Sequence, residues 1–170
     1  YALDANTTGG NNTAVGYEAL GANTTASYNT AVGRYAMKLN TTGSDNSAFG
    51  YNALDANTTG DNNTAIGLNA LGANTTADYN TAVGKNSLVA NTTGHNNVAV
   101  GNCMTANTTG QQNTAVGNSA LNANTTANYN TAFGNSALKT VTTGATNTAV
   151  GFQALRLTTA GSSTAVGAYA

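Results

Sequence analysis

A five-residue segment of alternating small, polar and apolar side chains recurs along the whole chain. It reads Asn-Thr-Ala-Val-Gly at 29–33 and 80–84, with close variants such as Asn-Ser-Ala-Phe-Gly at 46–50. Because successive side chains of a β-strand point to opposite faces, Thr and Val share one face, and Ala and Gly share the other. Each copy therefore predicts a short β-strand that ends at a glycine.

The copies are evenly spaced, which indicates a repeat protein. The closing glycines are 17 residues apart except for two steps of 16, for which we place one missing residue between Gly101 and Cys103 and the other between Leu155 and Thr158. The closing glycines are Gly16, Gly33, Gly50, Gly67, Gly84, Gly101, Gly117, Gly134, Gly151 and Gly167. Residues 1–170 are thus expected to form a single repeat domain of about ten coils.

Aligned repeats give two apolar columns and one column of small residues. The first apolar column contains Val15, Val32, Phe49, Ile66, Val83, Val100, Val116, Phe133, Val150 and Val166. The second contains Leu3, Leu20, Met37, Leu54, Leu71, Leu88, Met104, Leu121, Leu138 and Leu155, and Ala or a similar small residue precedes each of them. One repeat cannot bury these residues alone, so the copies must stack on one another.

The residue types favour strands over helices, because Asn, Thr, Gly and β-branched residues are poor helix formers. We therefore predict an all-β fold, a β-solenoid or β-roll of about ten 17-residue coils that forms an elongated rod. At a rise of about 4.8 Å per coil, the rod would be roughly 50 Å long. Each coil is expected to contain two or three short strands, with a return strand between the Ala-Leu and Asn-Thr-Thr segments.

Two lines of asparagine run through the repeats, and both are expected to form hydrogen-bonded ladders. The first, the structural ladder, consists of Asn12, Asn29, Asn46, Asn63, Asn80, Asn97, Asn113, Asn130 and Asn147, and ends at Ser163. The second consists of Asn6, Asn23, Asn40, Asn57, Asn74, Asn91, Asn107 and Asn124. Val141 takes the next place in the second line, so that ladder is predicted to end there.

The strand faces also suggest how chains could associate. If Val points into the coil, the small and flat Ala-Gly face is outside, where another chain could approach closely. The candidate assembly face begins with Ala14, Gly16, Ala31, Gly33, Ala48 and Gly50. The chain itself, in a homotrimer or a fibril, is the expected partner.

The composition supports association and excludes several partners. Charged residues make up 6% of the 170 residues and the net charge is −1, whereas about 25% is typical of globular domains. A solenoid that works as a single chain would expose more charge for solubility. Five basic residues cannot form a nucleic-acid-binding patch, and no apolar run reaches the ~20 residues needed for membrane insertion.

The sequence indicates no catalytic, cofactor-binding or metal-binding site. No pair of carboxylates recurs at a spacing that would build an acid–base site. His95, the only histidine, lies in a variable turn, and Cys103 occupies a place that alanine fills in most other repeats. We therefore expect a structural protein without cofactors.

Two ligand-related alternatives remain open, both of which would make the chain a ligand-binding or glycan-bearing solenoid. Each Asn of the second line starts an Asn-Thr-Thr sequence, which fits the acceptor pattern for N-glycosylation, and Asn11 and Asn62 fit it as well. The candidate glycan acceptors are therefore Asn6, Asn23, Asn40, Asn57, Asn74, Asn91, Asn107 and Asn124. The Thr columns also suggest ice binding, although adjacent Thr residues point to opposite faces and leave only single outward columns.

The repeat resembles known fibre proteins. The segment Asn-Thr-Ala-Val-Gly-Tyr-Glu-Ala-Leu-Gly-Ala-Asn-Thr-Thr-Ala-Ser-Tyr-Asn at 12–29 is similar to repeats of phage and bacterial tail-fibre-domain proteins. Its Ala-Val-Gly core more distantly resembles the head repeats of trimeric autotransporter adhesins, which are shorter. The resemblance implies a fibre shaft, often homotrimeric, that is extracellular, on a cell surface or on a virion. Binding to a receptor or glycan would then belong to variable loops or to segments outside this sequence, which begins and ends within a repeat.

Overall fold

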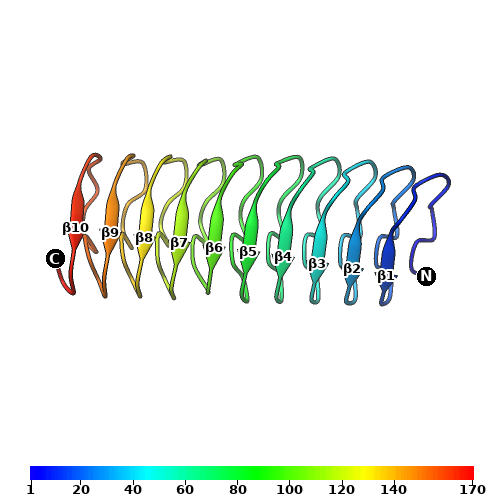
Figure 1. Ribbon diagram of the computed structural model, residues 1–170, viewed down its shortest axis with the longest axis horizontal. Helices are drawn as coiled ribbons and strands as arrows, with labels where there is room; N and C mark the ends of the chain where they lie inside the picture. Colours follow the sequence, from blue (N-terminus) through cyan, green and yellow to red (C-terminus); the bar gives the residue numbers. More distant parts are fainter.

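The chain forms an all-β solenoid of stacked coils. A computed structural model describes all residues from Tyr1 to Ala170. The rod-shaped molecule has its two termini at opposite ends, and each coil contributes one strand to a sheet that runs along its length (Figure 1). The strands are β1 (Thr13–Val15), β2 (Thr30–Val32), β3 (Ser47–Phe49), β4 (Thr64–Ile66), β5 (Thr81–Val83), β6 (Val98–Val100), β7 (Thr114–Val116), β8 (Thr131–Phe133), β9 (Thr148–Val150) and β10 (Thr164–Val166).

The ten strands form one parallel sheet in sequence order, in which each residue pairs with its equivalent in the next coil. The two short repeats keep this register, since Ala99 pairs with Ala115 and Ala149 with Ala165. The missing residues are therefore absorbed in the turns. The prediction of two or three strands per coil was wrong: each coil has one strand of three residues, and the rest of the coil is made of turns.

The turns replace strands because they place non-glycine residues in the left-handed backbone region. The Leu and Met column does so in every coil, with φ of 55° at Leu54 and 51° at Leu71. This conformation costs roughly 1–2 kcal/mol per residue, whereas complete burial of a leucine side chain contributes about 1.5–3 kcal/mol. Both leucines have no exposed surface, so burial outweighs the backbone strain.

The faces of the strands are reversed relative to the assembly-face prediction. The alternation itself is confirmed, because β2 to β9 each carry a buried central Ala between more exposed neighbours. However, Ala31 and Ala48 are completely buried, whereas Val15 and Phe49 are 58% and 41% exposed. The Ala-Gly face is therefore inside the coil, and the Val column is outside.

The interior explains this arrangement. The leucine column and the asparagine lines fill most of the space within each coil, so the strand can contribute only a methyl group. The glycines Gly16, Gly33 and Gly50 approach their counterparts in the next coil too closely for a side chain. At Gly50, with φ of 139°, an added Cβ would lie 2.6 Å from the carbonyl oxygen of Gly67.

Candidate functional surface: the outward strand face

The first asparagine line forms the predicted ladder. The backbone N–H of Asn46 donates to Oδ1 of Asn29 at 3.0 Å, and Nδ2 of Asn46 donates to the carbonyl of Gly60 in the next coil at 2.8 Å. The same pattern recurs from Asn12 to Asn147, and Ser163 ends it by donating its backbone N–H to Oδ1 of Asn147. Each amide thus links neighbouring coils while it satisfies a turn carbonyl.

The second asparagine line is linked directly through its side chains. Nδ2 of Asn57 donates to Oδ1 of Asn40 at 2.8 Å and to the carbonyl of Gly60 at 2.9 Å. The ladder ends at Asn124, because Val141 in the next coil has no amide. Asn124 Oδ1 is accordingly the only buried side-chain nitrogen or oxygen without a hydrogen-bond partner. The predicted end of the ladder is confirmed.

The interior position of this line removes it from the surface that a glycosylating enzyme could reach. Seven of the eight candidate glycan acceptors are completely buried, and only Asn6 in the first coil is partly exposed. Their amide nitrogens are engaged in hydrogen bonds between coils. The prediction that they are glycan acceptors therefore fails for the folded chain. The accessible acceptor sequences are those of Asn11 and Asn62, which are exposed.

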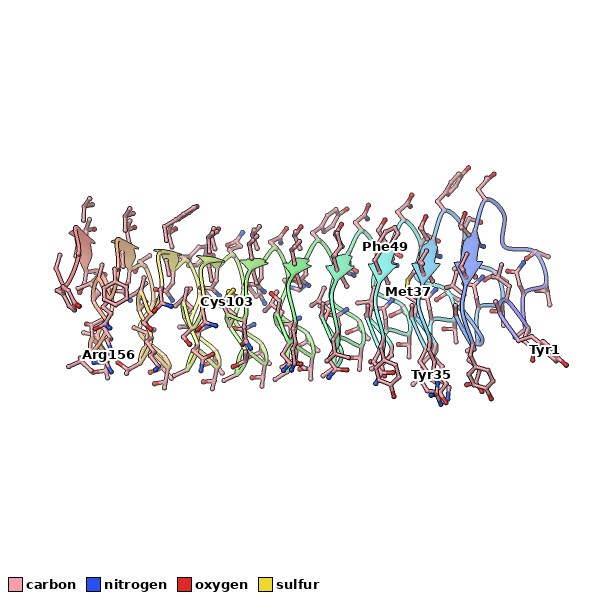
Figure 2. All side chains as sticks on the ribbon, turned by 90° about the horizontal axis from the view of Figure 1, so that it is seen from below. Tyr1, Tyr35, Met37, Phe49, Cys103 and Arg156 are labelled. Atoms are coloured by element: carbon pink, nitrogen blue, oxygen red, sulfur yellow. The ribbon has the colours of Figure 1, made fainter.

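The outward face of the sheet carries a regular surface of partly exposed apolar side chains that alternate with Thr and Ser. It consists of the first and third residues of each strand, which are Thr, Ser, Val, Ile or Phe, and contains no charged residue. Phe49, Ile66, Phe133 and Val150 are each about 40% exposed, at 41%, 41%, 44% and 39%. Phe49 projects from the strand side of the rod in Figure 2. We call this surface the outward strand face.

Sequence reasoning identified the residues of this face but placed them inside. It also missed a cluster on another side of the rod, where Tyr17, Arg34, Tyr35 and Tyr51 meet. Tyr35 and Phe49 point to opposite sides in Figure 2. The rings of Tyr17 and Tyr35 are 5.6 Å apart, and the Arg34 guanidinium lies 4.6 Å from the centre of the Tyr35 ring. The signal was present, because residues that follow the closing glycines of adjacent coils become neighbours after stacking.

The only ion pair of the structure lies beside this cluster, where Nζ of Lys38 is 4.8 Å from the centre of the Tyr35 ring. Nζ of Lys38 lies 2.9 Å from Oε2 of Glu18. The hydrogen bond from Lys38 lowers the pKa of the Glu18 carboxyl, and the hydrogen bond with Glu18 raises the pKa of Lys38. The Glu18 carboxylate also raises the pKa of the Tyr17 hydroxyl through a hydrogen bond. The positive charge of Lys38 is therefore paired with a carboxylate, whereas Arg34 has no carboxylate partner.

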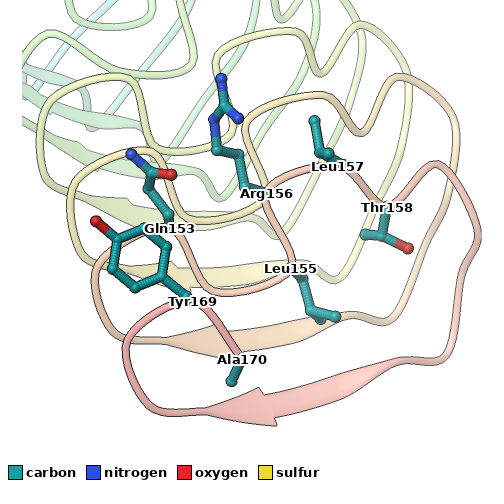
Figure 3. A pocket seen from close by; sticks show the side chains of 7 residues that line it. All are labelled: Gln153, Leu155, Arg156, Leu157, Thr158, Tyr169 and Ala170. Carbon is teal, nitrogen blue, oxygen red and sulfur yellow. The ribbon is translucent and has the colours of Figure 1, made fainter.

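The remaining candidate groups lie apart. Cys103 is completely buried in its alanine place, and burial raises the pKa of its thiol to about 11. No three His, Cys, Asp or Glu side chains come close enough to hold a metal ion. A pocket at the last coil is lined by Gln153, Leu155, Arg156, Leu157, Thr158, Tyr169 and Ala170 (Figure 3). Arg156 is its only charged side chain, so it contains no acid–base pair.

The structure contains no helix that could span a membrane. No protein-family model, no curated protein and no solved structure matches the chain.

Proposed function

We propose that the chain is a structural segment, the shaft of an extracellular or virion fibre, and that copies of it associate through the outward strand face. The observation that carries the proposal is the uncharged, partly apolar face that repeats in every coil of the rod. The tail-fibre-like repeat and the low charge of the chain support the same function. No catalytic step is assigned to the segment.

The size of the face fits an association surface. Nine rises of about 4.8 Å and a width of three residues at about 3.3 Å give roughly 430 Å² per copy. Exposed apolar patches of this size on soluble proteins are often functional. An ordinary interface buries about 800 Å² per partner, so flanking residues must contribute too. We therefore expect reversible association that depends on protein concentration.

A second copy of the chain is the occupant that best fits this face. The face presents the same contact at every coil, and a partner can match all of them only if it repeats with the same rise. Another copy fulfils this condition, and the absence of charge from the face avoids repulsion between identical surfaces. A threefold arrangement of parallel rods is the simplest closed assembly that the resemblance implies.

Ice binding fits the outward strand face less well. Thr and Val do share this face at regular spacing, so a single Thr column runs beside a column of Val, Ile and Phe, in agreement with the single outward Thr columns that the sequence predicts. However, the aromatic rings of Phe49 and Phe133 interrupt the rows of smaller side chains. A surface that matches an ice lattice must be flat, whereas a surface that packs against another protein can interlock around such rings. The two phenylalanines therefore favour association between chains.

The proposed association can be tested with a variant that carries two positive charges on the outward strand face. Ile66→Lys combined with Val83→Lys places two ammonium groups on adjacent coils without entering the core. In sedimentation velocity over a range of concentrations, the unchanged chain should form oligomers. The double variant should remain near the monomer mass of 16.8 kDa.

The matched control carries the same charges on the same coils. Thr59 and Thr76 are exposed on the turns, and their side chains make no hydrogen bond. Thr59→Lys combined with Thr76→Lys should leave the oligomers unchanged. Monomers at all concentrations for the unchanged chain, or equal dissociation by both double variants, would refute association through this face.

A further inference from the structure

The cluster around Arg34 has no role in the proposed association, because it lies away from the outward strand face. Arg34, Tyr17 and Tyr51 directly follow the closing glycines of the first three coils, and Tyr35 follows Arg34. Tyr35 lies between the other two rings, at 5.6 Å from Tyr17 and 6.0 Å from Tyr51. Three rings from adjacent coils thus form one aromatic surface with a guanidinium at its centre.

The guanidinium of Arg34 is held in place but only partly used. It lies 5.6 Å, 4.6 Å and 6.0 Å from the ring centres of Tyr17, Tyr35 and Tyr51. One of its N–H groups donates to the Tyr35 hydroxyl at 2.9 Å. A guanidinium has five N–H donors, so four remain available to a ligand. Because the rings already restrict the motion of the Arg34 side chain, little further side-chain entropy of Arg34 would be lost when a ligand binds.

The charges around Arg34 favour a negatively charged ligand. The Glu18 carboxylate, which follows Tyr17 in the chain, is paired with Lys38 at 2.9 Å, and no ion pair involves Arg34. Guanidinium groups bind carboxylate, sulfate and phosphate oxygens through paired hydrogen bonds. The unpaired cation therefore offers a position for an oxyanion on an otherwise weakly charged rod.

The tyrosine rings indicate the chemical nature of the rest of the ligand. Tyr17 and Tyr51 are 57% and 44% exposed, and each presents an apolar ring with a hydroxyl at its edge. Such a surface suits a sugar ring, which has an apolar face and hydroxyl groups around it. Nucleic acid would need a track of basic residues to follow its phosphates, and the neighbouring coil positions hold Leu68 and Asn69 instead.

We infer that Tyr17, Arg34, Tyr35 and Tyr51 form a binding site for an acidic saccharide. Arg34 binds the carboxylate or sulfate of the sugar, while the rings of Tyr17 and Tyr51 pack against the sugar ring. Tyr35 orients the guanidinium through its ring and hydroxyl. The site needs residues of three coils only, so it does not depend on association of the rods.

Isothermal titration calorimetry on the full chain would test the site with three hexasaccharides. The first is hexagalacturonate, the second is the same compound with every carboxylate methyl-esterified, and the third is a heparin-derived sulfated hexasaccharide. Binding of the first or third identifies a carboxylate or a sulfate as the preferred anion. The esterified compound should bind at least roughly tenfold more weakly, since it lacks the charge-assisted hydrogen bonds.

Two variants locate the binding. Arg34→Gln should weaken binding of the preferred acidic hexasaccharide by roughly tenfold or more. Lys85→Gln is the matched control, because Lys85 is an exposed cation at the same place in its coil but has no tyrosine beside it. It should leave the affinity unchanged.

Tyr17→Leu combined with Tyr51→Leu separates a sugar site from a simple anion site. It should weaken saccharide binding while leaving the weak binding of inorganic sulfate unchanged. The inference is overturned if no acidic hexasaccharide binds, if Arg34→Gln has no effect, or if Lys85→Gln has the same effect. It is also overturned if the tyrosine variant binds the saccharides as well as the unchanged chain does.

Discussion

At the scale of single residues, the fold depends on amides that connect one coil to the next. Asn57 is an example, because its side-chain nitrogen donates hydrogen bonds both to Oδ1 of Asn40 and to the carbonyl of Gly60. Buried polar groups are costly unless they are paired, and stacking pairs them at each step. The place where the pattern stops should therefore be a weak point of the rod.

Val141→Asn should repair that weak point. The new amide would donate to Asn124 Oδ1, which has no partner, and to the carbonyl of Gly144, as equivalent amides do in other coils. Thr158 follows in the line, and its hydroxyl can donate to the new side-chain oxygen. We expect the free energy of unfolding to rise by about 1 kcal/mol, measured by urea denaturation.

Val141→Ala is the control, since it supplies no donor and removes two buried methyl groups. It should lower the free energy of unfolding. An Asn variant that is no more stable than the unchanged chain would show that the orphaned oxygen of Asn124 costs little.

The buried thiol of Cys103 predicts a loss of stability at high pH. Its pKa is raised from 9.0 to about 11 by burial, so the folded state keeps the thiol protonated while the unfolded state ionises. The contribution of the protonated thiol to the free energy of unfolding is fully present below pH 9.0 and is lost as the pH rises towards 11. Between about pH 8 and pH 10.5, the unchanged chain should lose up to about 2 kcal/mol more than Cys103→Ala does.

Urea denaturation of both chains at the two pH values would measure this difference. Alanine is the appropriate replacement, because it fills the same place in most other coils. Equal losses in both chains would mean that the thiol ionises as easily in the folded state as in the unfolded state.

At the scale of the coil, one short strand is enough because the turns are held by contacts to the next coil. The side-chain hydroxyl of Thr58 donates to the carbonyl of Thr75 at 3.0 Å, and equivalent threonines do the same along the rod. Most coils repeat the same backbone conformation, which includes non-glycine residues with positive φ at matching places. The coil is therefore stable only within the stack.

Gly50→Ala should disrupt this stacking. The residue has a φ of 139° that alanine rarely adopts, and its Cβ would lie 2.6 Å from the carbonyl oxygen of Gly67. Because the obstacle is backbone, it cannot move aside without separating two coils. We expect a loss of more than about 2 kcal/mol in the free energy of unfolding.

Gly10→Ala provides the comparison, since nothing lies within 4 Å of its added Cβ. Thermal unfolding followed by circular dichroism should show little change for this variant. Similar effects of the two substitutions would indicate that close packing between coils is not what requires glycine at residue 50.

The sequence was sufficient to predict the coils, both asparagine ladders and the end of the second ladder at Val141. All three follow from stacking identical residues at a fixed spacing. The sequence could not show which strand face is inside. Alternation groups Ala48 with Gly50 and Ser47 with Phe49, but it is equally compatible with either orientation.

The orientation depends on how much space the rest of the coil leaves. With Leu54 and the amides of Asn46 and Asn57 in the interior, no room remains for the Phe49 ring. Turn conformations that place Leu54 at positive φ were also invisible in the sequence, since leucine usually avoids them. The cluster around Arg34 could have been predicted, since Tyr17, Arg34 and Tyr51 occupy the same place in adjacent coils.

At the scale of the whole molecule, equivalent residues recur at a constant spacing along the rod. The interior repeats almost without change, whereas the outward positions differ from one side of the rod to another. One side has the uncharged strand face, and another has the aromatic cluster with Arg34. Tyr28, Tyr79 and Tyr129 add exposed rings in every third coil, each about 60% exposed at 61%, 60% and 59%. We therefore expect different sides of the rod to have different functions, with association at the outward strand face and ligand binding at the cluster around Arg34.

The most direct test of the account is the distance between equivalent residues of associated chains. A spin label would be attached at Val83→Cys, or at Thr76→Cys, in a chain that also carries Cys103→Ala. Val83 lies on β5, near the middle of the rod, so its counterparts should be close in parallel and antiparallel arrangements alike. The account predicts a short distance between labels at residue 83 and a longer one at residue 76. A shorter distance at residue 76, or no distance between chains at either position, would contradict it.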